Sequence, residues 1–285
     1  MAEAYRRARY RGWLDLVESH LPMDNYLRIS TSSKALDRIP VEDLVNEKFD
    51  QDFAAPTTDI LIIFSTPRSG STLLCELLLK NSVCIAHEYL QSRQYLPLLG
   101  IRWGCVSGSG LTGKTLDLKR YADCLLRYRT LENGWFGLNL HGEHLKNYLK
   151  IEGLLPDVKF HYLQILRKDI VSQAVSYEIA SQTDQWSRHF SPTREVNYSF
   201  FRILHKLYRI QKQNALIASF LAARKLVAHQ IYYEDLVTKP GQVLSQIPNL
   251  SLEKSIDVES SLTRQTGALN AEWTSKFSKR FLNFA

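Results

Sequence analysis

The sequence has little of what a membrane-spanning or secreted protein needs. Its most apolar run, Leu73 to Leu79, is interrupted by Glu76 and is far shorter than the roughly 20 apolar residues that span a bilayer. The N-terminus has basic residues, but Asp15 and Glu18 stand where a signal peptide needs an apolar core. We therefore expect a soluble, cytoplasmic protein without a membrane span.

Cysteine is scarce, and the four cysteines form no C-x-x-C pair. Cys75 and Cys84 lie among aliphatic residues, where a free cysteine behaves as a small core side chain. We expect all four thiols to be reduced and unpaired.

Motifs for nucleic-acid binding are also missing, although the chain is basic. The 36 Lys and Arg against 29 Asp and Glu give a formal charge of +7. No zinc-finger spacing, RNP aromatic motif or basic-leucine pattern accompanies this charge. Since a basic surplus concentrates anions at a cleft without naming them, a phosphorylated small molecule fits it at least as well as a nucleic acid.

Aliphatic strands alternate with helical patterns over most of the 285 residues. We predict strands at 60–64, 83–86, 135–140, 160–166 and 225–232, helices at 71–80, 169–182 and 197–223, and a mostly helical stretch at 90–132. Such alternation indicates an α/β fold with a central, mainly parallel sheet of about five strands flanked by helices. Residues 1–57 are predicted to form a helical N-terminal appendage, with helices near 13–17 and 40–44, and residues 58–285 the main domain.

The most informative stretch joins the first buried strand to a helix and reads F-S-T-P-R-S-G-S-T-L-L from Phe64 to Leu74. The free N–H groups and positive dipole end of a helix start bind anions. Gly70 lets the main chain approach a ligand, Arg68 adds charge, and Ser71 and Thr72 add hydroxyl donors. A simple helix cap would need only one hydroxyl. The absence of a Walker loop and of a dinucleotide fingerprint disfavours an ordinary kinase or dehydrogenase.

A second arginine follows another strand. Arg167 comes after the strand at 160–166, and Asp169, Gln173 and Ser176 share one face of the next helix. An arginine and a hydroxyl on that face would bind a phosphate together, the arginine bidentately. The alternative is that Asp169 caps the helix and pairs with Arg167.

Glu88 is the candidate general base. It follows the strand at 83–86, whose end should emerge at the same sheet edge as the anion-binding loop. A carboxylate with a pKa raised by partial burial can accept the proton of an attacking hydroxyl. His87 is a rival base, and a structural surface glutamate is the alternative.

The segment T-P-R-S-G-S-T-L-L, from Thr66 to Leu74, resembles the 5′-phosphosulfate loop of sulfotransferases. Its serine-rich form with arginine is similar to that of the family of bacterial trehalose 2-sulfotransferase and the nodulation-factor sulfotransferases. The pattern R-x-D-x-x-x-Q-A-x-S, from Arg167 to Ser176, is similar to this family's 3′-phosphate segment. Glu88-Tyr89 matches the segment of its proposed base, although Ala86 replaces a proline. The resemblance covers about 59–277, including a Y-E-D-L segment at 233–236.

The resemblance implies a P-loop-like sulfotransferase fold and in-line transfer of a sulfuryl group from 3′-phosphoadenosine-5′-phosphosulfate (PAPS) to a hydroxyl of a carbohydrate or glycolipid, without a metal. Arg68 and the backbone of residues 69–72, which are Ser69, Gly70, Ser71 and Thr72, would bind the 5′-phosphosulfate. Arg167 and Ser176 would hold the 3′-phosphate, with Arg264 within reach of it, and Glu88 would be the base. A homodimer is also implied.

Two positions depart from the family or are ambiguous. Asn139 stands where the family commonly has a lysine, and Trp186 lies where the family has a tryptophan near the acceptor. Both are candidate substrate-binding residues, although Trp186 equally fits the core. His141 and His144 form an H-x-x-H pair for which the sequence offers no third ligand.

Two other functions stay open. A nucleotide-dependent phosphotransferase or kinase would need a Walker lysine and carboxylates for magnesium, and neither is apparent. A catalytically silent nucleotide-binding protein is kept open by Asn139, because asparagine brings no charge to the leaving phosphate.

Overall fold

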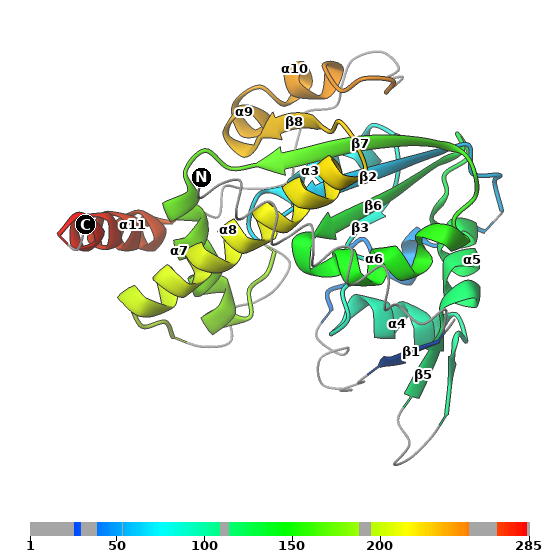
Figure 1. Cartoon of the computed structure of the whole chain (residues 1–285), viewed down its shortest axis with the longest axis horizontal. Coiled ribbons are helices and arrows are strands. Elements are labelled where there is room, and N and C mark those ends of the chain that lie inside the picture. The colour runs from blue at the N-terminus through cyan, green and yellow to red at the C-terminus, as the bar shows by residue number, and fades with distance from the viewer. Residues whose placement is uncertain are drawn as a thin grey trace.

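A five-stranded parallel sheet forms the centre of the computed structural model, which describes residues 26–29, 39–52, 54–108, 114–187, 195–250 and 267–283 (Figure 1). The strand order is β3-β6-β2-β7-β8. The strands are β2 (Asp59–Ser65), β3 (Ala86–His87), β6 (Trp135–His141), β7 (Lys159–Leu166) and β8 (His229–Tyr232). Every pairing between neighbours is parallel, and Asp59 of the middle strand lies opposite Trp135 and Lys159. The predicted α/β fold and its sheet of about five strands are confirmed.

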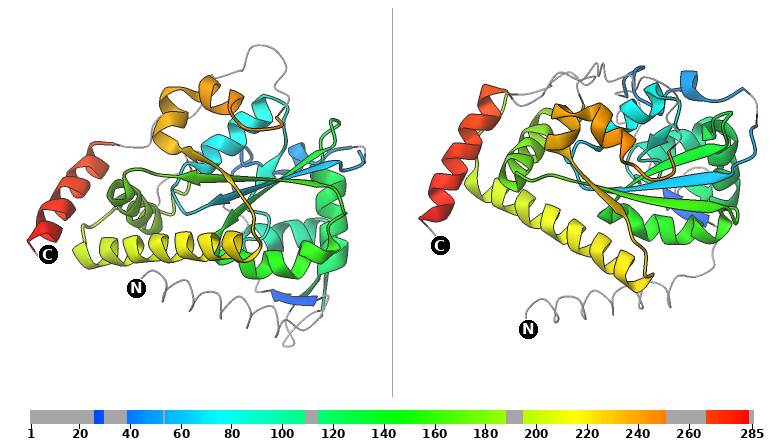
Figure 2. Two further views of the ribbon diagram at one scale, coloured as in Figure 1. Left: turned by 45° about the horizontal axis from the view of Figure 1, so that its top comes forward. Right: turned by 90° about the horizontal axis from the view of Figure 1, so that it is seen from above.

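Helices pack on both faces of this sheet (Figure 2). Ile60, Ile62 and Phe64 of β2 point into one apolar cluster, with α4 (Tyr95–Arg102), α5 (Leu118–Arg129), α6 (Leu145–Ile151) and part of α8 (Phe200–Ala223). Leu61 and Ile63 point the other way, toward α3 (Ser71–Lys80), α9 (Tyr233–Thr238) and α10 (Pro240–Ser245). All five side chains are buried, which explains why the strand is a continuous aliphatic run.

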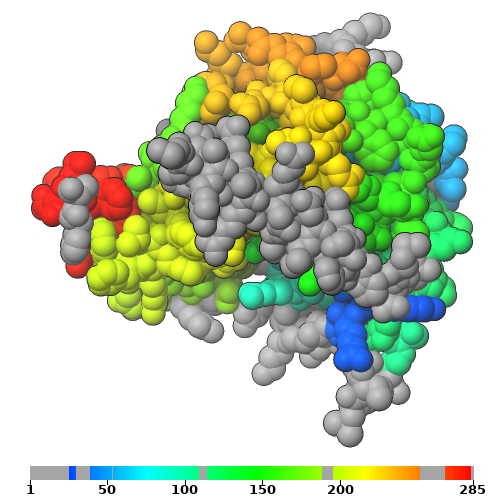
Figure 3. Space-filling view, viewed as in Figure 1, coloured from blue at the N-terminus to red at the C-terminus, as the bar shows by residue number. Residues whose placement is uncertain are grey.

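A third apolar cluster lies where the long helix α8 meets α7 (Ile170–Thr183) and α11 (Ala268–Leu282). Figure 3 shows α11 at one end of the molecule. Because α8 contributes to two clusters, it ties this end to the sheet. None of the helices in the described ranges is both long enough and apolar enough to cross a bilayer.

The N-terminal residues contain features that the sequence did not predict. The strand β1 (Tyr26–Ile29) forms a second, antiparallel sheet of order β1-β5-β4 with β4 (Val106–Ser107) and β5 (Lys114–Asp117). The helix predicted at 40–44 is wrong: residues 41–46 form turns and are followed by the 3₁₀ helix η1 (Glu47–Phe49). Asp43 accepts the N–H of Val45 at 3.1 Å, a local bond that competes with a helix. The helix predicted near 13–17 lies outside the described residues, and the appendage at 1–57 stays a prediction.

Arg129 attaches the segment 39–50 to the main body. This side chain at the end of α5 is fully buried and donates to the carbonyls of Leu44, Val45 and Asn46 and to the Asp50 carboxylate. Val45 is itself completely buried in the core. The segment is therefore part of the folded body and can contribute to a site. All four cysteines are free, as expected.

Candidate active site

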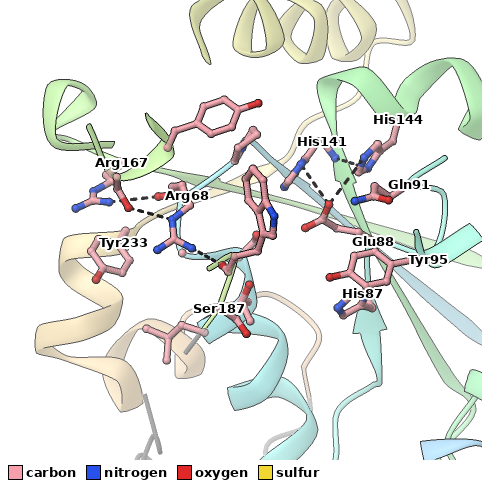
Figure 4. Close-up of a pocket in the computed structure, with 18 of the residues that line it drawn as sticks. Arg68, His87, Glu88, Gln91, Tyr95, His141, His144, Arg167, Ser187 and Tyr233 are labelled. Atoms are coloured by element: carbon pink, nitrogen blue, oxygen red, sulfur yellow. Dashed lines mark hydrogen bonds and ion pairs between the residues drawn. The ribbon is translucent and has the colours of Figure 1, made fainter. Parts of the chain in front are cut away.

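A cavity of about 800 Å³ lies at the carboxyl ends of β2, β3, β6 and β7 (Figure 4). Its walls include the loop after β2, the segment after β3, the start of η3 (Gly142–His144), and parts of α7, α8 and α9. After β2, the chain continues to β3, which lies on one side of β2 in the sheet, whereas β7 pairs with the other side of β2. The cavity therefore sits at a switch point of the sheet, where ligands of open α/β folds bind.

The loop between β2 and α3 has an unusual backbone. Arg68 and Gly70 have positive φ angles of 64° and 95°, and Gly70 is the N-cap of α3 without a side-chain cap. The first N–H groups of α3 are thus left for an anion. A Cβ atom at Gly70 would overlap the ring of Tyr233, so both the φ angle and the space require glycine.

Helix α7 holds this loop in place. Gln173 is buried, and its Nε2 donates to Thr66 Oγ1 at 2.9 Å and to the Pro67 carbonyl at 2.8 Å. Asp169 caps the same helix by accepting the N–H of Ser172 at 2.8 Å. Helix α7, which follows Arg167, therefore fixes the loop that carries Arg68.

The two arginines lie next to each other. Arg167 Nη1 donates to the carbonyl of Arg68 at 3.3 Å, and Arg68 Nε donates to Ser176 Oγ at 3.0 Å. Arg68 also donates to the Trp186 carbonyl. Burial, reinforced by the nearby Arg167 cation, lowers the pKa of Arg68 to about 10. A bound anion would relieve this repulsion between like charges.

Arg167 has its own set of contacts. Its Nη2 donates to Ser172 Oγ at 3.2 Å, its Nε lies 3.9 Å from Glu234 Oε1, and its guanidinium lies over the ring of Tyr233, 4.7 Å from the centroid. The serine beside Arg167 is therefore Ser172, whereas Ser176, which the sequence paired with it, contacts Arg68. Tyr233 belongs to the Y-E-D-L segment at 233–236 that the resemblance to the sulfotransferase family includes.

Glu88 lies in the same cavity, as predicted from the strand ends. Its side chain is 19% exposed. Burial raises the pKa of Glu88 to about 7, with smaller contributions from Glu143 and Asp43 and an opposing one from His87. His87 Nε2 is paired with Asp43 Oδ1 at 3.1 Å. A carboxyl group with such a pKa can take up and release a proton near neutral pH.

Two histidines stand beside Glu88. His141 Nδ1 and His144 Nε2 lie 3.4 and 3.8 Å from Glu88 Oε2. Burial lowers the pKa of His141 well below 6.5 and that of His144 to about 3. The expectation that the H-x-x-H pair has no third partner is wrong, because β6 pairs with β3 and brings both rings to Glu88.

The model of the Stf0 sulphotransferase family matches residues 60–280. The chain belongs to the Stf0 sulfotransferase family. A search of curated proteins gave no match. The protein is therefore a sulfotransferase, and the resemblance carried by the two arginine turns is confirmed.

The remaining candidate residues of this sulfotransferase fall into two groups, those that line the cavity and those that are buried away from it. Gly70, Ser71, Thr72 and Trp186 line the cavity, and the Trp186 ring packs edge-on against Tyr177 at 6.1 Å. The side chains of Ser69 and Asn139 are buried away from it. Asn139 Oδ1 accepts a hydrogen bond from Ser65 Oγ at 2.6 Å, whereas Ser69 Oγ has no hydrogen-bond partner among the described residues. Arg264 lies outside the described residues.

The far wall of the cavity in this sulfotransferase has charged side chains that the sequence did not single out, namely Arg93, Glu143, Lys206 and Arg209. Arg209 pairs with Glu143 at 2.8 Å, and Lys206 lies over the Tyr177 ring, 4.4 Å from its centroid. Only the helical period of α8 hints that Lys206 and Arg209 share one face.

Proposed function

We propose that this sulfotransferase transfers the sulfuryl group of PAPS to a hydroxyl of a carbohydrate or glycolipid. The observation that carries the proposal is the closeness of Arg68 and Arg167. Arg167 donates a hydrogen bond to the backbone carbonyl of Arg68, and both residues line one cavity. PAPS carries its 3′-phosphate and its 5′-phosphosulfate on a single ribose. Two adjacent guanidinium groups at an uncapped helix start suit those two anionic groups.

Each end of the donor has its own partners in this proposal. Arg68 and the N–H groups of residues 69–72 bind the 5′-phosphosulfate and stabilise the charge that develops on the departing phosphate. Loss of one such donor typically costs about 2.7–4 kcal/mol of barrier. Arg167 holds the 3′-phosphate together with Ser172 or Ser176, since both hydroxyls lie at the two guanidinium groups.

Glu88 is the proposed base. The acceptor oxygen attacks sulfur while the bond from sulfur to the 5′-phosphate oxygen breaks, and the hydroxyl proton passes to Glu88. The products are a sulfate ester and 3′-phosphoadenosine-5′-phosphate (PAP). No covalent bond to the enzyme forms. A pKa of about 7 suits Glu88 to this proton transfer.

The acceptor class rests on the family resemblance and on the cavity wall. Trp186 and Tyr177 offer aromatic surface, and charged and polar groups line the rest, a combination that suits a sugar. A cytoplasmic location is proposed because the four free thiols fit a reducing compartment. A homodimer is proposed from the resemblance alone.

The test is a transfer assay with PAPS labelled in the sulfuryl group and a panel of sugars and glycolipids. Label should enter an acceptor without magnesium, and PAP should raise the melting temperature, again without magnesium. Arg167→Met should abolish the PAP shift, whereas Arg224→Met, a matched arginine paired with Glu152 outside the cavity, should not. Stabilisation by ATP with magnesium and not by PAP would refute the donor.

A further inference from the structure

The far wall of the cavity carries a surplus of positive charge. Arg93, Lys206 and Arg209 line it, and Glu143 is the only acid named among them. We propose that this wall binds an anionic group of the acceptor, so that the sugar to be sulfated carries a phosphate or a carboxylate. The inference rests on the proposed function, because it assigns the substrate class of the same site.

The cations of α8 converge on one aromatic ring. Tyr177 of α7 is only 4% exposed, and its ring lies under two charges. Lys206 Nζ is 4.4 Å and the Arg209 guanidinium carbon 5.6 Å from the ring centroid. Residues three apart are neighbours on one helix face. Both charges are therefore held at one place in the wall.

The phenol of Tyr177 lies between this wall and the proposed base. Burial raises the pKa of Tyr177. The cations Arg209 and Arg93 lower it, whereas the carboxylates Glu143 and Glu88 raise it further. Charges act on a pKa at short range, so these four groups surround the phenol. One acceptor lying against the ring can thus reach both the wall and the base.

Lys206 keeps hydrogen-bond donors for a ligand. Its Nζ lies 3.9 Å from Oε2 of the buried Glu178, too far for a hydrogen bond. That carboxylate already accepts from Gln182 at 2.8 Å and lies 3.8 Å from Arg202. Burial lowers the pKa of Lys206 despite Glu178, and the cations Arg209 and Arg202 lower it further. A bound anion would offset this cost.

The carboxylates at the far wall do not balance its cations. Arg209 pairs with Glu143 at 2.8 Å, and two further cations share Glu178. Arg93 pairs with no carboxylate in the part of the chain that the structure describes. Four cations therefore face two carboxylates. A neutral sugar would leave the excess charge uncompensated, whereas a phosphate or carboxylate would neutralise it.

The other carboxylates of the cavity do not cancel this surplus. Asp43 is paired with His87 at 3.1 Å. Asp184 follows Tyr177 by seven residues, about two turns along α7. Glu88, with a pKa of about 7, is only partly ionised at neutral pH. The far wall therefore keeps its positive charge.

The donor nucleotide is the competing occupant of the far wall. Its two anionic groups already have Arg68 and Arg167, which Figure 4 shows on the other side of the view from Glu88. Ser176 contacts Arg68, whereas the next residue, Tyr177, carries the ring at the far wall. The wall is therefore assigned to the acceptor.

The first test titrates inorganic phosphate onto protein saturated with PAP, which occupies the donor arginines, and follows binding by calorimetry. Wild type should bind one phosphate. Lys206→Met should weaken this binding by about tenfold or more, because a hydrogen bond between charged groups is lost, and Lys206→Arg should restore most of it. Lys212→Met, at an exposed lysine of α8 outside the cavity, is the control. Absence of phosphate binding by wild type would overturn the inference.

A second variant changes the same affinity in the opposite direction. Glu143→Gln should strengthen phosphate binding several-fold, because it removes an opposing charge and frees the guanidinium of Arg209. A purely structural ion pair predicts no such gain. Unchanged or weaker phosphate binding in a folded Glu143→Gln protein would contradict an anion site at this wall.

The third test compares matched acceptors in the transfer assay, namely glucose with glucose 6-phosphate and with glucuronate, and galactose with galacturonate. An anionic member should have the higher kcat/KM. Lys206→Met should raise its KM by about tenfold, with little change in the KM for PAPS. A preference for the neutral member of every pair would overturn the inference.

Failure of the proposed function has a separate signature. Absence of transfer to any sugar, or of PAP binding, would contradict the proposed activity or its donor. The loss of phosphate affinity between wild type and Lys206→Met still decides the inference in that case, because it is measured without turnover.

Discussion

At the scale of single residues, burial gives Glu88 both its reactivity and a cost in stability. Its pKa is raised from 4.5 to about 7, mainly by desolvation. The folded protein therefore holds this proton at pH values where the unfolded chain has released it. Stability falls as pH rises from about 4.5 to 7 and then levels off. Catalytic activity should instead rise over this pH range, because Glu88 must be ionised to act as a base.

Glu88→Gln should therefore separate activity from stability. The variant should lose about 10²–10⁴-fold in kcat, yet gain up to about 3 kcal/mol relative to wild type between pH 5 and pH 8, because one pKa unit corresponds to about 1.4 kcal/mol. Urea unfolding at the two pH values measures the gain. Glu132→Gln, at an exposed residue outside the cavity, is the matched control. An equal difference between Glu88→Gln and wild type at both pH values would contradict the assigned pKa.

Several site residues could be predicted from the sequence because parallel strands end at one edge of a sheet. Arg68, Glu88 and Arg167 each follow such a strand, and all three line one cavity. His141 and His144 could not be linked to Glu88 in this way. Their contact depends on β6 lying between β3 and β2, an order that no local pattern encodes.

At the scale of elements, the loop after β2 is held between α7 and α9. Gln173 of α7 binds its backbone, and the ring of Tyr233 at the start of α9 covers Gly70. The same ring stacks on Arg167. The shape of the loop and the position of the second arginine are thus coupled through one tyrosine.

Gly70→Ala should weaken PAP binding by about tenfold or more, because the added methyl displaces the Tyr233 ring and strains a backbone at positive φ. Calorimetric titration measures the affinity. Combining it with Tyr233→Ala should give less than the sum of the two single losses, since the clash is shared. Gly153→Ala, where no atom lies within 4 Å of the new Cβ, is the control. If the losses of PAP affinity in the two single variants add up to the loss in the double variant, the Tyr233 ring and the loop at Gly70 act independently, which would contradict this coupling.

Element prediction succeeded where one pattern dominated a segment. The helix predicted at 71–80 coincides with α3, because apolar periodicity and the glycine before it agree. The helix predicted at 40–44 was wrong because Pro40 suggested a helix start, whereas Asp43 makes a local turn and pairs with His87. The antiparallel sheet was missed because its strands have only two to four residues.

At the scale of the whole molecule, one buried charge joins distant parts of the chain. Arg129 holds the segment 39–50, and that segment carries Asp43 to the cavity wall. Arg129→Leu should lower the free energy of unfolding by about 3–5 kcal/mol, the typical cost of breaking a buried ion pair. Denaturant unfolding measures it, with the exposed neighbour Arg127→Leu as control. A loss equal to that of the control would contradict this role.

The position of both phosphates of PAP in a crystal structure of the complex tests the central claim most directly. We predict the 5′-phosphate at Arg68 and the N–H groups of residues 69–72, the 3′-phosphate at Arg167, and the ribose between them. A nucleotide bound elsewhere, or with either phosphate beyond reach of its arginine, would contradict the account.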